Sequence, residues 1–210
     1  MSLIKRWGEY AKQYGWGGLV RYVAARLVRS VWERSLVQFL YLDKPVPPVA
    51  AKVPLRVEVL PPERAQLAPG CADPAAGRRW AQGDVCYIAW RDTECVHYSW
   101  VSRVNSPVDE VHGILRVAAG EAYIYSCFTS GEHRGLGIFP AVLSLIEGEL
   151  FASGVQRVWI AVEAENVASA KAIRRAGFLP AGTVSYRRVG SSVKRSVRRE
   201  PGAPPFELMP

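Results

Sequence analysis

The segment that decides the fold runs from residue 122 to residue 144 and reads AYIYSCFTSGEHRGLGIFPAVLS. Its first eight residues are mostly apolar and β-prone, which predicts a strand over Ala122–Thr129. After a polar turn, Arg134-Gly135-Leu136-Gly137-Ile138 leads into an apolar stretch that predicts a helix over Leu136–Ser153. Glycines at a helix start let backbone N–H groups approach an anion, and the helix dipole favours negative charge there. The segment predicts a phosphate-binding turn; the alternative is that the glycines serve only to turn the chain from strand to helix.

A second segment, residues 157–178, reads RVWIAVEAENVASAKAIRRAGF. It predicts a short buried strand over Arg157–Val162 and a helix over Val167–Ala176. Gly177 follows the last helical residue, at a position where helices commonly end in glycine. Taken alone, this segment indicates a capped helix and nothing more specific.

Together, in this order and at this separation, the two segments resemble the GNAT superfamily of CoA-dependent N-acyltransferases. The family's pyrophosphate motif, R/Q-x-x-G-x-G/A, is matched at Arg134 and Gly137, whereas Phe139 stands where the family has a small residue. The family's later N-x-x-A/S…GF pattern is matched by Asn166, Ser169, Gly177 and Phe178. The resemblance covers about residues 54–190.

The resemblance implies an α/β fold in which helices flank a central mixed, mostly antiparallel sheet. Near the N-terminus, apolar residues at four-residue spacing from Leu19 to Val31 predict helix, and several prolines between residues 45 and 54 predict an extended linker. We expect four parts: a helical, basic and aromatic-rich extension over residues 1–43, a Pro-rich linker over 44–54, a GNAT-like acyltransferase domain over 55–199 and a loose Pro-rich tail over 200–210.

The resemblance also implies acetyl-CoA as cosubstrate. In the family, the strand before the glycine turn separates from its neighbour, and the pantetheine arm pairs with it as an extra strand would. A backbone N–H near Cys127 would stabilise the negative charge that develops on the thioester oxygen. The residues expected to bind acetyl-CoA are Cys127, Phe128 and Thr129 on the strand, Arg134, Gly135, Leu136, Gly137 and Ile138 in the turn, and Asn166 and Ser169 beyond it.

The resemblance defines the catalytic side chains less well. Many relatives have a tyrosine that protonates the departing thiolate where this chain has Ile173, and some have a carboxylate base near the position of Tyr123. Solvent is one alternative source of that proton. The candidate catalytic residues are therefore His97, Tyr123, Tyr125, Cys127 and Glu165.

Each candidate has a plainer alternative. His97 has an ordinary pKa suited to proton transfer near neutrality, but it is equally explained as a packed strand histidine. A period of two places Tyr123 and Tyr125 on the strand face of Cys127, whose covalent role direct transfer does not require. Glu163 and Glu165 end a strand where a substrate cleft should open. They fit acid–base chemistry, the binding of a cationic amine, or simple solvation near a helix start.

The formal net charge of +8 would suit a nucleic acid, but this charge lies at the two ends of the chain. Residues 1–43 carry seven basic and three acidic side chains, residues 44–185 carry fourteen of each, and residues 186–210 carry six and two. A neutral middle and a basic tail without interleaved aromatics argue against a nucleic-acid partner. The four cysteines and three histidines show no metal-ligand spacing, so we expect no metal and a reducing, cytoplasmic location.

Residues 1–43 also contain eight aromatic side chains. Basic residues with Trp, Tyr and Leu are typical of helices that rest on an acidic membrane surface, which would make the protein peripheral on the inner face. The same composition suits a dimer contact or packing on the domain. Both alternatives stay open at this point.

The sequence thus predicts an enzyme that moves acetyl from acetyl-CoA directly to the amine of a small molecule. The favoured acceptor is an amino sugar, nucleotide- or lipid-linked, by analogy with similar chains that have an extra N-terminal segment and a H-R-G-x-G-I-[FY]-P-A turn, here residues 133–141. The alternatives are a non-catalytic acyl-CoA-binding or regulatory module, and acyl or aminoacyl transfer to a peptide, protein or cell-envelope precursor.

Overall fold

The structure is a computed structural model that describes residues 32–68 and 74–210. The described chain belongs to two compact units. One contains Ser185–Ser196 and the described residues up to Ser35, and the other contains Leu36–Val184 and Val197–Pro210. The elements that form the site below all belong to the second unit.

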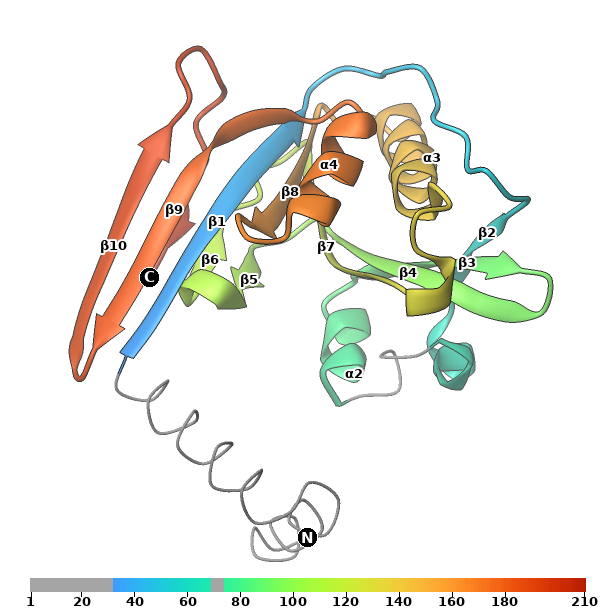
Figure 1. Cartoon of the computed structure of the whole chain (residues 1–210), viewed down its shortest axis with the longest axis horizontal. Helices are drawn as coiled ribbons and strands as arrows, with labels where there is room; N and C mark the ends of the chain where they lie inside the picture. Colours follow the sequence, from blue (N-terminus) through green and yellow to red (C-terminus); the bar gives the residue numbers. More distant parts are fainter. Residues whose placement is uncertain (1–31, 69–73) are drawn as a thin grey trace, which may run out of the picture. The chain divides into compact units, whose positions relative to one another are not determined.

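An eight-stranded sheet, with strand order β10-β9-β1-β8-β7-β4-β3-β2, is the centre of the fold (Figure 1). Its strands are β1 (Trp32–Leu42), β2 (Arg56–Leu60), β3 (Val85–Arg91), β4 (Glu94–Ser102), β7 (Glu121–Thr129), β8 (Arg157–Glu163), β9 (Leu179–Val189) and β10 (Ser192–Arg199). Strands β7 and β8 run parallel, whereas β1–β8, β2–β3, β3–β4 and β4–β7 are antiparallel pairs. The expected mixed, mostly antiparallel sheet is confirmed.

In the second unit of the chain, helices cover both faces of this sheet. Helices α3 (Ile138–Ala152) and α4 (Val167–Arg175) lie on one side in Figure 1, and α2 (Pro74–Ala81) lies on the other. A short 3₁₀ helix, η1 (Pro62–Leu67), precedes α2. Buried apolar side chains form two clusters that match this arrangement. One cluster contains residues of α3 and α4, and the other contains Ala76 of α2.

The predicted N-terminal helix is wrong for residues 32–42, which form strand β1 instead. Val37, Phe39 and Leu40 are fully buried, and β1 pairs with β8 from Val37↔Glu163 to Leu42↔Val158. A strand covered on both faces reads as a continuous apolar run, which periodicity alone cannot distinguish from a buried helix. The helical pattern of residues 19–31 and most of the aromatic-rich extension lie outside the described residues.

A smaller sheet of three strands, ordered β11-β6-β5, joins the chain's tail to the middle of the sequence. Strands β5 (Ser106–Val108) and β6 (Gly113–Leu115) flank the 3₁₀ helix η2 (Asp109–Val111). Strand β11 (Leu208–Met209) pairs with β6.

The tail is packed rather than loose, contrary to the expectation for residues 200–210. Phe206 is 3% exposed, and its ring stacks on Phe39 with centroids 4.5 Å apart and meets Trp159 edge-on at 6.3 Å. One aromatic side chain thus gives a Pro-rich segment an anchor in the core, which composition alone does not reveal.

We expect Phe206→Ala to destabilise the protein by about 3–5 kcal/mol, because it leaves a cavity beside two aromatic rings. Urea unfolding monitored by circular dichroism measures this change. Glu207→Gln is the matched control, since it removes only an exposed ion pair with Arg116 and should change stability far less. Equal stability of Phe206→Ala and the parent would contradict the packed tail.

Candidate functional site

The site begins where strands β7 and β8 part. Their parallel register runs from Glu121↔Arg157 to Ile124↔Ile160 and is not continued in the residues that follow. Both strands go on, β7 to Thr129 and β8 to Glu163. The sheet therefore opens between the last residues of two neighbouring strands, as the family resemblance predicts.

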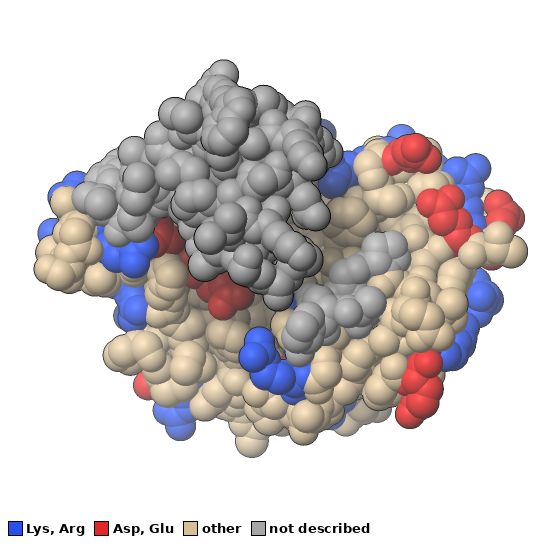
Figure 2. All heavy atoms as spheres, turned by 90° about the horizontal axis from the view of Figure 1, so that it is seen from below, with Lys and Arg blue, Asp and Glu red and all other residues tan. Residues whose placement is uncertain are grey.

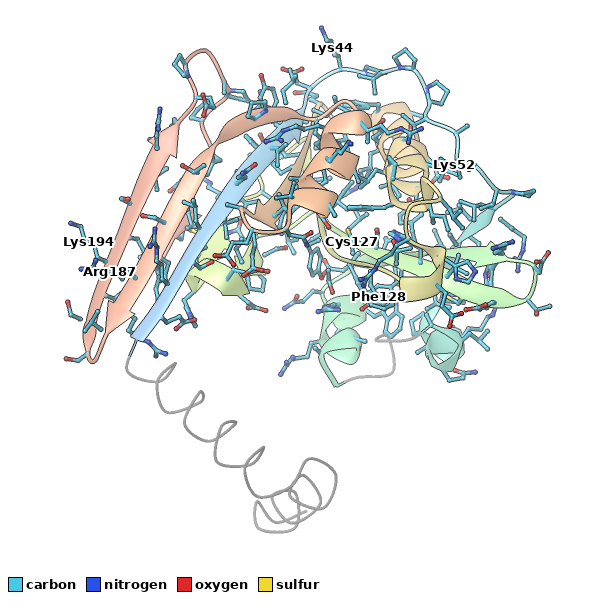
Figure 3. The ribbon with its side chains drawn as sticks, in the orientation of Figure 1. Lys44, Lys52, Cys127, Phe128, Arg187 and Lys194 are labelled. Atoms are coloured by element: carbon cyan, nitrogen blue, oxygen red, sulfur yellow. The ribbon has the colours of Figure 1, made fainter. Side chains whose placement is uncertain are left out.

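A β-bulge marks the same point on the other edge of β7. Strand β4 pairs with β7 at Trp100↔Tyr125 and next at Tyr98↔Phe128, so two residues of β7 lie opposite one residue of β4. Ser126, in the bulge, has a φ of 47°. A bulge re-aims the groups that follow it. Here it changes the direction of Cys127 and Phe128, labelled in Figure 3 on β7.

A cavity of about 660 Å³ lies between the end of β7, the glycine turn and α4. It brings together nine of the ten residues predicted to bind acetyl-CoA: Cys127, Phe128, Thr129, Arg134, Gly135, Gly137, Ile138, Asn166 and Ser169. The tenth, Leu136, does not line the cavity. Its carbonyl accepts a hydrogen bond of 2.8 Å from the backbone N–H of Lys52.

The start of α3 is suited to an anion. Gly137 is its N-cap, with a φ of 75° that favours glycine, and no described side chain caps this helix. Helix α4 differs, because its N-cap Asn166 accepts a hydrogen bond of 3.1 Å from the backbone N–H of Ser169. The first-turn N–H groups of α3 are thus left for a ligand, with the helix dipole favouring negative charge.

Three cationic side chains line the cavity, and sequence reasoning identified only Arg134. The other two, Lys171 and Arg175, lie one turn apart on α4, and the i, i+4 spacing was the available signal. Arg134 also donates from Nε to the carbonyl of Thr129 at 3.2 Å, which ties the turn to the end of β7. The cavity therefore combines helix-start amides with positive charge, as a pyrophosphate requires.

The linker holds the glycine turn from another side. Lys52, labelled in Figure 3, donates from its backbone N–H to Leu136 and from Nζ to the carbonyl of Gly135 at 3.1 Å. The backbone N–H of Val49 donates to Oγ of Ser144 on α3 at 3.0 Å. Residues 44–54 contain no helix or strand, and they support the turn.

His97 lines this cavity with its ring almost fully buried, at 1% exposure. Its Nδ1 lies 2.7 Å from Oγ1 of Thr129, and its Nε2 lies 2.8 Å from Oγ of Ser99. The ring of Phe139 stacks on it, with centroids 5.5 Å apart. Burial lowers the pKa of His97 to about 3, so the imidazole is neutral at physiological pH. This environment fits a positioning role for His97 better than proton transfer.

The two candidate tyrosines are also poor bases. Burial raises the pKa of Tyr123, which is 4% exposed, and burial together with a hydrogen bond to Asp84 raises the pKa of Tyr125. The expected common face with Cys127 is not observed for Tyr125. Cys127 packs against the cluster that contains Ile124, whereas Tyr125 packs against the other cluster. The bulge between them interrupts the period of two.

Cys127 lines the cavity with a protonated thiol. Burial raises the pKa of Cys127 to about 12, an effect that a hydrogen bond with Ser99 partly opposes. Because the thiolate is the nucleophilic form, this thiol is poorly suited to attack a thioester at neutral pH.

A second cavity of about 180 Å³ adjoins the first. Both are lined by Cys127, Phe139, Asn166 and Ser169. The smaller cavity adds two carboxylates, Glu110 from η2 and Glu163 from the end of β8.

Glu165, the carboxylate that sequence reasoning favoured as a catalytic group, is exposed and lines neither cavity. Glu110 was missed because no local pattern distinguishes it from an ordinary surface glutamate.

Residues 32–68 and 74–210 contain no group of three or more His, Cys, Asp or Glu side chains that could hold a metal ion. In the same part of the chain, no helix is long and apolar enough to cross a membrane. On the face seen in Figure 2, the described lysines and arginines are interspersed with acidic side chains and do not form one patch.

The model of the acetyltransferase (GNAT) family matches residues 58–178, which is more than half of the chain. This chain belongs to the GNAT acetyltransferase family. The match spans β2 to α4 and so includes the divergent strands, the glycine turn and the cationic face of α4. A search of curated proteins found no match.

Solved structures support the fold. A GNAT-family acetyltransferase from Colwellia psychrerythraea has 15% identity and a TM-score of 0.53, over 82% of this chain and 62% of that one. A GCN5-related N-acetyltransferase from Sphaerobacter thermophilus has 16% identity and a TM-score of 0.52, over 92% and 68%. One from Kribbella flavida has 17% identity and a TM-score of 0.50, over 79% and 62%. This chain therefore spans less than two thirds of the length of the Colwellia and Kribbella proteins.

The buried, neutral state of His97 predicts a pH effect on stability. In the folded protein the imidazole resists protonation down to about pH 3, whereas the unfolded imidazole takes up a proton near its ordinary pKa of 6.5. The contribution of His97 to stability is therefore complete above about pH 6.5 and is lost as the pH falls towards 3.

We expect the unfolding free energy of the parent to exceed that of His97→Gln by more at about pH 7.5 than at about pH 5. Urea unfolding of both proteins at the two pH values measures the difference, and the carboxylates common to both cancel. The same difference at both pH values would contradict a lowered His97 pKa.

Proposed function

We propose that this GNAT-family protein transfers acetyl from acetyl-CoA directly to the amine of a small molecule, with amino sugars as the first acceptor class. The observation that carries the proposal is the pair of adjoining cavities. The larger has the helix-start amides and three cations, and the smaller has two carboxylates. A phosphorylated donor and an amine acceptor would thus meet at their junction.

The larger cavity supplies what CoA requires. The free edge of β7 beyond Ile124 offers backbone groups to the pantetheine arm. The N–H groups at the start of α3, with Arg134, Lys171 and Arg175, offer donors and positive charge to the phosphates. Acetyl-CoA, when bound, supplies a thioester carbonyl that an amine can attack and a thiolate that departs.

The protein's part in the chemistry is mainly electrostatic and positional. A backbone N–H in the bulge region near Cys127 would stabilise the negative charge on the thioester oxygen, which is typically worth about 10²–10³ in rate. His97, Tyr123 and Tyr125 all have pKa values moved away from neutrality, so solvent is the source of the thiolate's proton in this proposal.

The smaller cavity suits a protonated amine. Glu110 and Glu163 reach it from two separate elements, and carboxylates hold an ammonium group by charge-assisted hydrogen bonds. In this proposal the ammonium then loses a proton to solvent, and the neutral amine nitrogen attacks the thioester carbon as the C–S bond breaks. We assign Glu163 to the binding of the acceptor amine, in place of the catalytic role first considered for Glu165.

A non-catalytic acyl-CoA-binding module is the second candidate. It is favoured by one observation, that His97, Tyr123 and Tyr125 are poor proton acceptors near neutral pH. It requires acetyl-CoA binding without thiol release on any acceptor. A thiol-release screen with amines, amino acids, free amino sugars and nucleotide-linked amino sugars separates the two functions.

We expect acetyl-CoA to bind the parent protein with measurable heat, and Arg175→Gln to weaken binding about tenfold by removing a charged donor. Isothermal titration calorimetry measures both. Arg174→Gln is the matched control, because the neighbouring Arg174 donates to Gln38 at 3.0 Å and lines neither cavity. No heat with the parent at near-millimolar concentrations would contradict acyl-CoA binding altogether.

For an acceptor found in the screen, we expect Glu163→Gln to raise the acceptor KM about tenfold with a smaller change in kcat, because it removes an attraction for the amine. Steady-state kinetics over a pH series provide the measurement. Glu165→Gln should behave like the parent. A lower kcat with an altered pH profile and an unchanged KM would instead make Glu163 the base.

A further inference from the structure

The junction between the two cavities is formed by four residues. Cys127, Phe139, Asn166 and Ser169 line both the larger and the smaller cavity. On the function proposed above, on which this inference rests, the amine must come within about 3–3.5 Å of the thioester carbon. The acyl group therefore has to lie at this junction, against these four side chains.

Phe139 is by far the largest of the four side chains. It belongs to the first turn of α3, directly after the glycine turn, and is half-buried against the main apolar cluster. The other three are small and polar or contain a single thiol. The space left for an acyl chain at the junction is thus set mainly by one aromatic ring.

This ring rests on a fixed neighbour. His97 stacks on it at 5.5 Å, and His97 is held at both ring nitrogens, by Thr129 on β7 and Ser99 on β4. Because displacing a buried imidazole would break both hydrogen bonds, Phe139 cannot easily move in that direction to make room. The Phe139 ring is therefore held rigidly on the side that faces the sheet.

We propose that Phe139 limits the acyl chain that this protein accepts to a short one such as acetyl. A longer chain extends from the thioester carbon into the space that the Phe139 ring fills, and the small second cavity must also hold the acceptor amine. Each methylene gained or lost in an apolar pocket changes discrimination by about tenfold or more. Phe139 thus determines acyl specificity without taking part in proton transfer.

The test needs no acceptor, because it compares dissociation constants of CoA, acetyl-CoA and hexanoyl-CoA by calorimetry. We expect the parent to bind hexanoyl-CoA more weakly than acetyl-CoA by about tenfold at the least, and Phe139→Ala to remove most of that difference. Phe139→Leu, which keeps an apolar side chain, should give an intermediate ratio and serves if the alanine variant does not fold. Phe151→Leu is the matched control on the same helix, since Phe151 packs on the same cluster but lines neither cavity.

The proposal is supported if the ratio of the hexanoyl-CoA to the acetyl-CoA dissociation constant falls in the Phe139 variants and keeps its parental value in Phe151→Leu. Equal binding of both acyl-CoAs by the parent, or an unchanged ratio in folded Phe139 variants, overturns it. Failure of the parent to bind CoA or acetyl-CoA at all would instead overturn the proposed function, so the two failures are distinguishable.

Discussion

The loss of pairing between β7 and β8 beyond Ile124 and Ile160 is the constraint on which the rest of the site depends. Backbone N–H and C=O groups are strong hydrogen-bonding groups, and a strand that leaves its partner offers them to something else. In this fold the opening comes in the middle of a sheet, covered by α3 and α4 on one side. A ligand can therefore pair with backbone groups inside the sheet, and no outer edge strand has to be left unpaired for it.

The bulge in β7 and the stack of His97 on Phe139 give this opening its shape. The bulge changes which residues point to each face, so Cys127 joins the cluster under α3 while Tyr125 packs on the opposite side. His97, on β4, is linked to the end of β7 through the Thr129 hydroxyl, is fixed on its own strand by the Ser99 hydroxyl, and supports the first turn of α3. Strand, bulge and helix start are thereby held in one arrangement by neutral side chains, at no cost of a buried charge.

Segments outside the family match support this arrangement. The linker before β2 donates hydrogen bonds to the glycine turn through Lys52, and β1 pairs with β8 on the side away from β7. The tail contributes Phe206 to the core and a strand to the small sheet, whose η2 carries Glu110. Residues distant in sequence thus bring one carboxylate of the second cavity into place.

The sequence by itself determined the glycine turn and the helices on either side of β8, and it pointed to ten residues for acetyl-CoA binding, of which nine line the larger cavity, because these features are local. A strand, a turn and a helix start within a few residues leave a readable pattern. Tertiary structure alone decided that residues 32–42 are a strand, that Glu110 meets Glu163, and that Phe139 rests on His97. Each of these depends on burial or on contacts between residues far apart in the chain, and local periodicity carries no information about such partners.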